Sequence, residues 1–286
     1  MKIWCLVSCI DDYIEKYGEK FINRKWDGFD LIFIDYSCIE IGTGDGPVFY
    51  CMGKRLELPD AFWAWTGNTD SRVIEHLLLS CGIKSIANLK EQDVARSKVA
   101  TYNRIASAGL PVPRTFVFFN HPDRDMIKER FPYPFVIKPD NGFGGEGVAL
   151  IHDDNEFDAY LADLKFGVAY MVQEYIATSR GRDVRVVMLK GDCFHSYIRQ
   201  AGDPDEFRSN IHTGGSRLPF ELDGETKKMC RKAAALFDLK VIGLDLMFAE
   251  NGFVFSEVNS FPGLQKEYRN KVIETVIGDF LRENNA

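Results

Sequence analysis

The sequence predicts a mixed α/β protein built from two or three subdomains. The chain has 286 residues, whereas one compact domain usually has roughly 150. An apolar run at 3–10, a helical pattern over 13–26 and a second apolar run at 31–36 are typical of a β-α-β unit. Short apolar runs separated by turn dipeptides in the last third of the chain predict antiparallel strands there.

The expected elements divide the chain into three parts. A helix over 70–79 is followed by Gly82, and a longer helix over 93–109 stops before Pro111. Strands on either side of a glycine-rich turn come next, and antiparallel strands joined by hairpin turns follow them. We therefore predict an N-terminal α/β domain at 1–92, a central lobe at 93–170 and a C-terminal lobe at 171–286.

Composition limits the classes of partner that the chain can have. Hydrophobic residues make up 45% and charged residues 27%, a balance that allows a buried core. The formal net charge is −7 with acidic residues spread along the chain, so we expect no nucleic-acid partner. The run at 3–10 is too short to span a membrane and has no signal-peptide pattern, so we expect a cytoplasmic protein without a membrane partner. The seven cysteines include no CxxC pair and are interpreted as reduced, with a catalytic cysteine as the alternative.

Lys138 gives the first chemical signal, because it ends a buried strand just before a glycine-rich loop. The loop, NGFGGEG at 141–147, contains Gly144 and Gly145. Glycines let backbone N–H groups approach phosphate oxygens, and the lysine supplies positive charge beside them. A strand follows the loop, so it fits neither the Walker pattern nor a dinucleotide-binding turn. A plain β-hairpin with a glycine turn is the alternative interpretation.

Two predicted strands near the C-terminus carry oxygen-bearing side chains. Glu257 and Asn259 are two residues apart on one strand and therefore face the same side. Antiparallel pairing through a turn at Asn251-Gly252 can bring Asp245 beside them. Carboxylates that share an apolar interior repel each other unless a cation neutralises them, and Mg²⁺ prefers such oxygens. A polar, exposed strand face is the alternative.

Three arginines lie on or near the strands between these two signals. They are Arg185, Arg199 and Arg208. Guanidinium groups stabilise the charge that gathers on a transferred phosphoryl group. A solvated or ion-paired surface side chain is the alternative for any one of them.

Taken in order, these residues form a succession that covers most of the chain. Its members are Lys98, Lys138 with its loop, Gln173-Glu174-Tyr175, Gly181-x-Asp183-x-Arg185, Arg199, Phe207-Arg208-Ser209-Asn210, Asp245, Glu257-x-Asn259 and Pro262-Gly263. This order resembles the ATP-grasp family, and most of all its branch of RimK-type glutamate ligases and LysX-type ligases. The resemblance covers about 52–264 and is dense from Ser97 onward.

The resemblance implies an ATP-grasp fold, in which a Rossmann-like N-terminal lobe precedes central and C-terminal lobes that grip ATP. It assigns nucleotide binding to a set of residues around those two lobes: Lys98, Lys138, Gly144, Gly145, Gln173, Glu174, Tyr175, Asp183, Arg185 and Ser209. Within this set the two lysines would contact the phosphates, Glu174 and Tyr175 the adenine, and Asp183 the ribose or a nearby group.

The resemblance also implies metal ligands and catalytic groups. The metal ligands would be Asp245, Glu257 and Asn259, holding Mg²⁺ as two ions, with Mn²⁺ as a substitute. The catalytic groups would be Arg199, Arg208 and Asn210, which would meet the γ-phosphate and the activated carboxylate.

The activity implied is ligation of a carboxylate to an amine through an acyl phosphate, with ADP and phosphate as products. We expect addition of an amino acid such as glutamate to a peptide, a protein tail or a small amino-acid-like acceptor. Amide or ester formation within a ribosomal peptide is one alternative, and a non-catalytic ATP-binding sensor is another. A homodimer or homotetramer is a further expectation. The segment 64–72 and Phe143 depart from the usual pattern of the branch, which leaves the substrates open.

Overall fold

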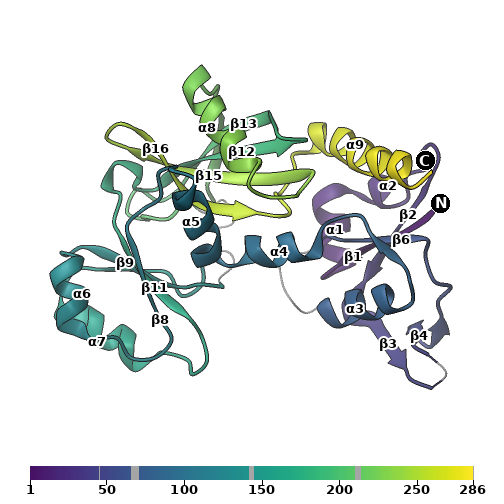
Figure 1. Cartoon of the computed structure of the whole chain (residues 1–286), viewed down its shortest axis with the longest axis horizontal. Helices are drawn as coiled ribbons and strands as arrows, with labels where there is room; N and C mark the ends of the chain where they lie inside the picture. The colour runs from purple at the N-terminus through teal and green to yellow at the C-terminus, as the bar shows by residue number, and fades with distance from the viewer. Residues whose placement is uncertain (45, 66–70, 142–144, 210–213, 286) are drawn as a thin grey trace. The chain divides into compact units, whose positions relative to one another are not determined.

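The chain forms two compact units (Figure 1). The computed structural model describes residues 1–44, 46–65, 71–141, 145–209 and 214–285. The first unit joins Met1–Lys90 to Gly263–Ala286, and the second comprises Glu91–Pro262. The C-terminal helix thus belongs to the first unit, whereas the sequence placed it in the C-terminal lobe. The three-part division at 92 and 170 stays a prediction.

A four-stranded parallel sheet in the order β2-β1-β6-β7 is the centre of the first unit. Its strands are β1 (Lys2–Val7), β2 (Asp30–Asp35), β6 (Ala61–Ala64) and β7 (Lys84–Ser85). Trp4 and Leu6 alternate with their neighbours and pack with Ile74 and Leu78 of helix α3 (Arg72–Ser80). The predicted β-α-β start is confirmed, and Asp70, the first residue of the helix predicted over 70–79, lies outside the described residues.

Three further helices of this unit are α1 (Ile10–Tyr17), α2 (Glu19–Ile22) and α9 (Lys266–Asn285). The Arg269 guanidinium of α9 lies 4.4 Å from the ring centroid of Tyr17 and 3.5 Å from that of Phe21. The single helix predicted over 13–26 is wrong. Gly18 adopts φ 85°, a left-handed value that ends α1 and starts a second helix. The short antiparallel strands β3 (Ile39–Gly42), β4 (Val48–Cys51) and β5 (Lys54–Arg55) complete the unit.

The helix predicted over 93–109 is also two helices, α4 (Leu89–Arg96) and α5 (Lys98–Ser107). Ser97 separates them because its backbone is extended, with φ −90° and ψ 114°. Its hydroxyl accepts a hydrogen bond from the Ala100 N–H at 3.1 Å and so caps α5. This break makes Lys98 the first residue of a new helix.

The smaller sheet of the second unit has the order β10-β9-β11-β8. Its strands are β8 (Thr115–Phe118), β9 (Phe135–Pro139), β10 (Ala149–Ile151) and β11 (Tyr170–Glu174). Helices α6 (Arg124–Arg130) and α7 (Asp154–Ala162) cover one face (Figure 1), where Phe135, Ile137 and Phe157 are buried. Lys138 and Gln173 alternate with these core residues and therefore lie on the other face.

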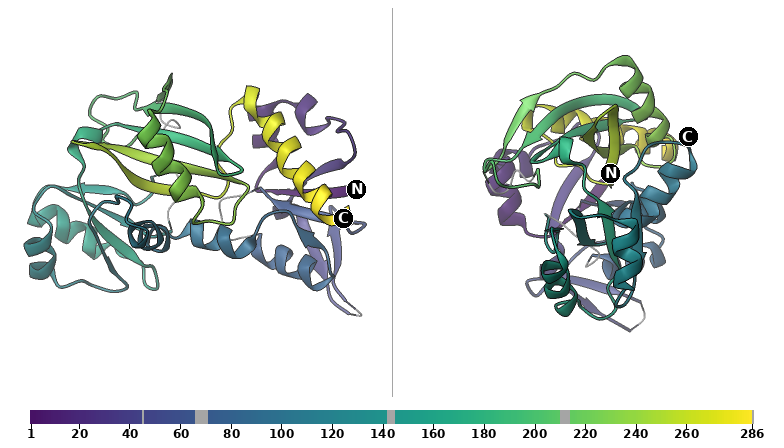
Figure 2. Two further views of the ribbon diagram at one scale, coloured as in Figure 1. Left: turned by 45° about the horizontal axis from the view of Figure 1, so that its top comes forward. Right: turned by 90° about the vertical axis from the view of Figure 1, so that its left-hand side faces the viewer.

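The larger sheet has the order β14-β13-β12-β15-β16 and is antiparallel throughout. Its strands are β12 (Arg182–Leu189), β13 (Asp192–Gln200), β14 (Ser216–Pro219), β15 (Val241–Ala249) and β16 (Gly252–Asn259). Helix α8 (Gly224–Ala234) crosses one face (Figure 2), where Val184 and Val186 are buried with Cys230. Asp183 and Arg185 alternate with these valines and face the opposite side. The hairpin predicted at Asn251-Gly252 is confirmed, and a second hairpin turns at Lys190-Gly191 between β12 and β13.

We predict that Phe157→Ala lowers the free energy of unfolding of the second unit by about 3–5 kcal/mol, because Phe157 is wholly buried and leaves a cavity. Phe166→Ala is the matched control, since Phe166 is fully exposed and its loss should change stability by less than about 0.5 kcal/mol. Urea unfolding of both variants measures the difference. Equal losses would contradict the core assignment.

Candidate active site

Four charged side chains from three neighbouring strands lie on the face of the larger sheet that is opposite α8. The strand register places Asp183 opposite Arg199 and Arg185 opposite Asp245. Arg185 donates through Nε and Nη2 to Asp245, the second bond at 2.9 Å. Arg199 donates through Nε to Asp183 at 2.7 Å and through Nη2 to both Asp183 and Asp245, the latter at 2.6 Å. Two guanidinium groups and two carboxylates therefore neutralise one another.

Asp245 is the most deeply buried member of this group, with no solvent exposure. Burial opposes its charge, but the Arg185 and Arg199 guanidiniums outweigh that effect and hold its pKa below the usual range. Asp245 is therefore an ionised carboxylate at neutral pH.

The predicted metal ligands meet on the same face. The register places Glu257 directly opposite Asp245, as expected, and Asn259 Nδ2 lies 3.5 Å from Asp245 Oδ2. The Glu257 side chain is 35% exposed, and its Oε1 lies 3.6 Å from Lys98 Nζ. Two carboxylates and a carboxamide oxygen are a donor set that fits a hard divalent cation such as Mg²⁺.

The counter-charge of Asp245 differs from what the sequence predicted. A cation was expected because Asp245 and Glu257 would otherwise repel each other, yet the arginines already neutralise Asp245. The described residues include no group of three or more His, Cys, Asp or Glu side chains placed to hold a metal. The types of donor, rather than an uncompensated charge, therefore favour a metal here.

Lys138 is a buried cation on the face of the smaller sheet that also carries Gln173. Only 9% of Lys138 is exposed, and among the described residues its ammonium makes no hydrogen bond or ion pair. Its Nζ lies 5.8 Å from the ring centroid of Tyr102. Burial and the nearby charge of Lys98 lower the pKa of Lys138 to about 7, against the opposing effect of Glu257 and Asp140. An anionic ligand would supply the counter-charge that Lys138 lacks.

Asp140 and Tyr102, which sequence reasoning did not assign, hold this region together. The Asp140 carboxylate accepts hydrogen bonds from Ser97 Oγ and the Val99 N–H, both at 2.8 Å. The Tyr102 hydroxyl donates to the Ser256 carbonyl at 2.6 Å and lies 3.3 Å from Gln173 Oε1. The start of α5 is thereby tied to β11, to β16 and to the end of β9. The Pro139-Asp140 step after Lys138 was the signal in the sequence that could have revealed Asp140.

Arg208 connects its own segment to the glycine-rich loop. Its Nη1 donates to the Gly145 carbonyl at 3.0 Å. Glu206, which sequence reasoning also missed, accepts from the Arg208 N–H, Nε and Nη2 at 2.9, 2.9 and 2.6 Å. Ser209 Oγ donates to Asp183 Oδ2 at 2.6 Å. The predicted site residues Gly144 and Asn210 lie outside the described part of the chain.

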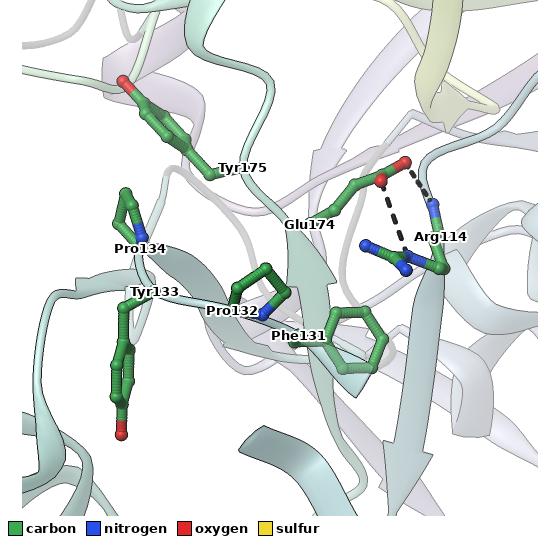
Figure 3. Close-up of a pocket in the computed structure, with 7 residues that line it drawn as sticks. All are labelled: Arg114, Phe131, Pro132, Tyr133, Pro134, Glu174 and Tyr175. Carbon is green, nitrogen blue, oxygen red and sulfur yellow. Dashed lines mark hydrogen bonds and ion pairs between the residues drawn. The ribbon is translucent and has the colours of Figure 1, made fainter. Parts of the chain in front are cut away.

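Glu174 and Tyr175 line a separate hollow of about 200 Å³ (Figure 3). Glu174 Oε1 accepts from the Arg114 N–H at 2.7 Å, and Oε2 lies 3.6 Å from Arg114 Nε. Glu174 follows Gln173 on β11, so its side chain lies on the opposite face from Lys138. The structure thus brings Gln173, but not the Glu174 side chain, to the face that carries the lysine.

The family follows from the match of residues 95–278 to the model of the RimK-like ATP-grasp domain. The chain belongs to the RimK-like ATP-grasp family. A protein of Vibrio parahaemolyticus named "Probable alpha-L-glutamate ligase" is 31% identical over 254 residues, which cover 85% of this chain and 82% of that one. The predicted family resemblance is therefore confirmed.

Solved structures agree on the fold. The RimK domain ATP-grasp protein of Sphaerobacter thermophilus has a TM-score of 0.71 at 17% identity and covers 98% of this chain and 99% of its own. The D-alanine–D-alanine ligase of Bacillus anthracis, solved with ATP, has a TM-score of 0.70 at 17% identity and covers both chains fully. The ATP-grasp fold is confirmed, and the chain is an ATP-grasp ligase of a family that uses ATP with Mg²⁺. Among the described residues, no helix is long and apolar enough to cross a membrane.

The buried charge of Lys138 should make the stability of the nucleotide-free protein depend on pH. The pKa of Lys138 is lower in the folded chain than its ordinary 10.5, so its ionisation opposes folding below about pH 7, and this penalty is relieved as the pH rises toward 10.5. We predict that Lys138→Met raises the free energy of unfolding at pH 7 by more than about 1 kcal/mol and weakens ATP binding. The gain in stability should shrink as the pH rises.

Urea unfolding between pH 7 and 10 and an ATP titration measure the two effects. Lys165→Met is the control, because Lys165 is an exposed lysine of the same unit. A gain in stability that is the same at every pH, or unchanged ATP affinity, would show that Lys138 has a purely structural role.

Proposed function

We propose that this ligase activates a substrate carboxylate as an acyl phosphate and joins it to the amine of an amino acid such as glutamate. The contact between Lys98 and Glu257 carries this proposal. Lys98 lies near Lys138, whose pKa it lowers, and Glu257 pairs with Asp245 across the sheet, so the lysines that suit the phosphates and the carboxylates that suit the metal lie close together within one unit of the chain. A triphosphate that neutralises Lys138 would then lie next to Asp245 and Glu257.

Each group has a role that its surroundings support. Lys98 and Lys138 bind phosphate oxygens, and Gln173 lies on the same face as Lys138. Asp245, Glu257 and Asn259 would hold Mg²⁺, as two ions and replaceable by Mn²⁺, and the bound metal would neutralise phosphate charge.

The remaining groups stabilise charge on the group that is transferred. Arg199 and Arg208 donate to its oxygens as charge develops there, and Glu206 orients Arg208. The reaction needs no covalent nucleophile from the protein, because ATP supplies the activation and the substrate amine attacks the acyl phosphate.

The relatives support the proposed substrate class. The Vibrio parahaemolyticus protein is named "Probable alpha-L-glutamate ligase", so glutamate is the first amine to test. The acceptor in this proposal is a peptide, a protein tail or a small amino-acid-like molecule that bears a carboxylate. Phosphate release measured against a panel of amino acids and short acidic peptides tests the pairing. A product formed from a peptide alone, without an added amino acid, would favour intramolecular ligation instead.

The products identify the phosphorus atom that is attacked. We predict that each amide formed is accompanied by one ADP and one phosphate, because the lysines, the metal ligands and Arg199 surround the terminal phosphate in this proposal. Chromatography of the spent reaction measures the nucleotides. AMP as the main product with any competent acid and amine would mean that the protein adenylates its substrate.

Glu257 is the accessible carboxylate of the metal set and should control the Mg²⁺ requirement. We predict that Glu257→Gln raises the Mg²⁺ concentration needed for half-maximal turnover by at least about tenfold, because a charged ligand is lost. Glu250→Gln is the matched control, since Glu250 is exposed at the end of β15. A Mg²⁺ titration of ADP formation measures both, and an equal requirement in the two variants would remove Glu257 from the metal set.

A further inference from the structure

Arginine side chains make the short hydrogen bonds of Asp245, and Asn259 Nδ2 lies farther away, at 3.5 Å from Oδ2. Its Oδ1 accepts from Arg185 Nε, and its Oδ2 accepts from Arg185 Nη2 at 2.9 Å and Arg199 Nη2 at 2.6 Å. The carboxylate has no solvent exposure. A divalent cation that uses Asp245 as a ligand must therefore compete with a guanidinium group that is already there.

The two arginines differ in how replaceable their contact with Asp245 is. Arg185 donates through two nitrogens and is itself buried. Arg199 touches Asp245 through Nη2 alone, and its side chain is 16% exposed. Its Nε and Nη2 also bind Asp183, so Arg199 can lose the contact with Asp245 and remain anchored to a second carboxylate.

We propose that Arg199 is a place-holder for the divalent cation: it binds Asp245 in the nucleotide-free protein and releases it when the metal binds. This inference rests on the proposed assignment of Asp245 and Glu257 as metal ligands. It adds a competition between Arg199 and the metal for Asp245. This competition would not be expected if Arg199 only bound phosphate.

Charge balance explains why the exchange would be useful. Arg185, Arg199, Asp183 and Asp245 are neutral as a group, so a divalent cation alone leaves a positive excess in a buried site. A triphosphate beside the metal supplies negative charge and new acceptors for the Nη2 group that Asp245 has released. Metal and nucleotide should therefore strengthen each other's binding, and a metal without nucleotide should bind weakly.

The test measures Mn²⁺ binding to the intact, nucleotide-free protein by titration calorimetry, with the count of bound ions from electron paramagnetic resonance. Arg199→Gln should bind Mn²⁺ at least about tenfold more tightly than the wild type, because the competing cation is gone. Arg217→Gln is the matched control. Arg217 lies opposite Arg199 on β14 and is exposed. Its replacement therefore removes the same charge without changing a contact of Asp245.

A second variant should change the Mn²⁺ affinity in the opposite direction. It tests the inference if Arg199→Gln fails to fold. Asp183→Asn removes the carboxylate that shares Arg199, so Arg199 should bind Asp245 more strongly and Mn²⁺ binding should weaken. A non-hydrolysable ATP analogue should raise Mn²⁺ affinity in the wild type by a larger factor than in Arg199→Gln.

The outcomes separate this inference from the metal assignment on which it rests. Glu257→Gln should weaken Mn²⁺ binding if the assignment is right. Suppose that Glu257→Gln weakens Mn²⁺ binding but Arg199→Gln does not tighten it. The metal site then stands and the place-holder role is overturned. The same conclusion holds if Arg217→Gln tightens Mn²⁺ binding as much as Arg199→Gln does. If Glu257→Gln binds Mn²⁺ as the wild type does, the metal assignment fails and the place-holder role fails with it.

Discussion

The buried carboxylate of Asp245, held between two guanidinium groups, is the interaction on which the rest of the site depends. It joins β12, β13 and β15 at the centre of the larger sheet through side chains rather than through the backbone ladder. A lone charge at this depth would cost several kcal/mol, roughly, so each member of the group is stable only while the others remain. The position of Glu257 on the neighbouring strand follows from the same register.

Lys138 has the opposite character, since it is buried without a carboxylate of its own among the described residues. Tyr102 and the Asp140 network fix the backbone around it, yet among the described residues its ammonium makes no hydrogen bond or ion pair with them. A protein that maximised its own stability would place an apolar side chain here. A cation whose pKa is lowered to about 7 at this position fits the proposed role of Lys138, in which the phosphates of ATP supply the counter-charge.

Sequence patterns predicted the strands and their polar faces well, because both depend on a period of two residues. Lys138 at the end of β9 and the pairing of Asp245 with Glu257 were read from alternation and a hairpin turn. Helix boundaries were less successful. Ser97 and Gly18 each interrupt an otherwise continuous helical pattern through local backbone conformation, which amphipathic periodicity does not register. Glu206 was missed because it precedes Arg208 by only two residues and resembles an ordinary surface carboxylate.

By itself, the sequence determined the family, the order of the elements and the residue types of the site, since each of these is recorded in local pattern and spacing. Tertiary structure decided which charge pairs with which. Asp245 lies 60 residues from Arg185 and 46 from Arg199, and only the antiparallel register of three strands brings them together. The choice of partner depends on that register and on burial, because a charge removed from water must find an opposite charge within reach. The arginines and carboxylates therefore form a neutral group only in the folded chain, and only there does the lysine remain outside that group.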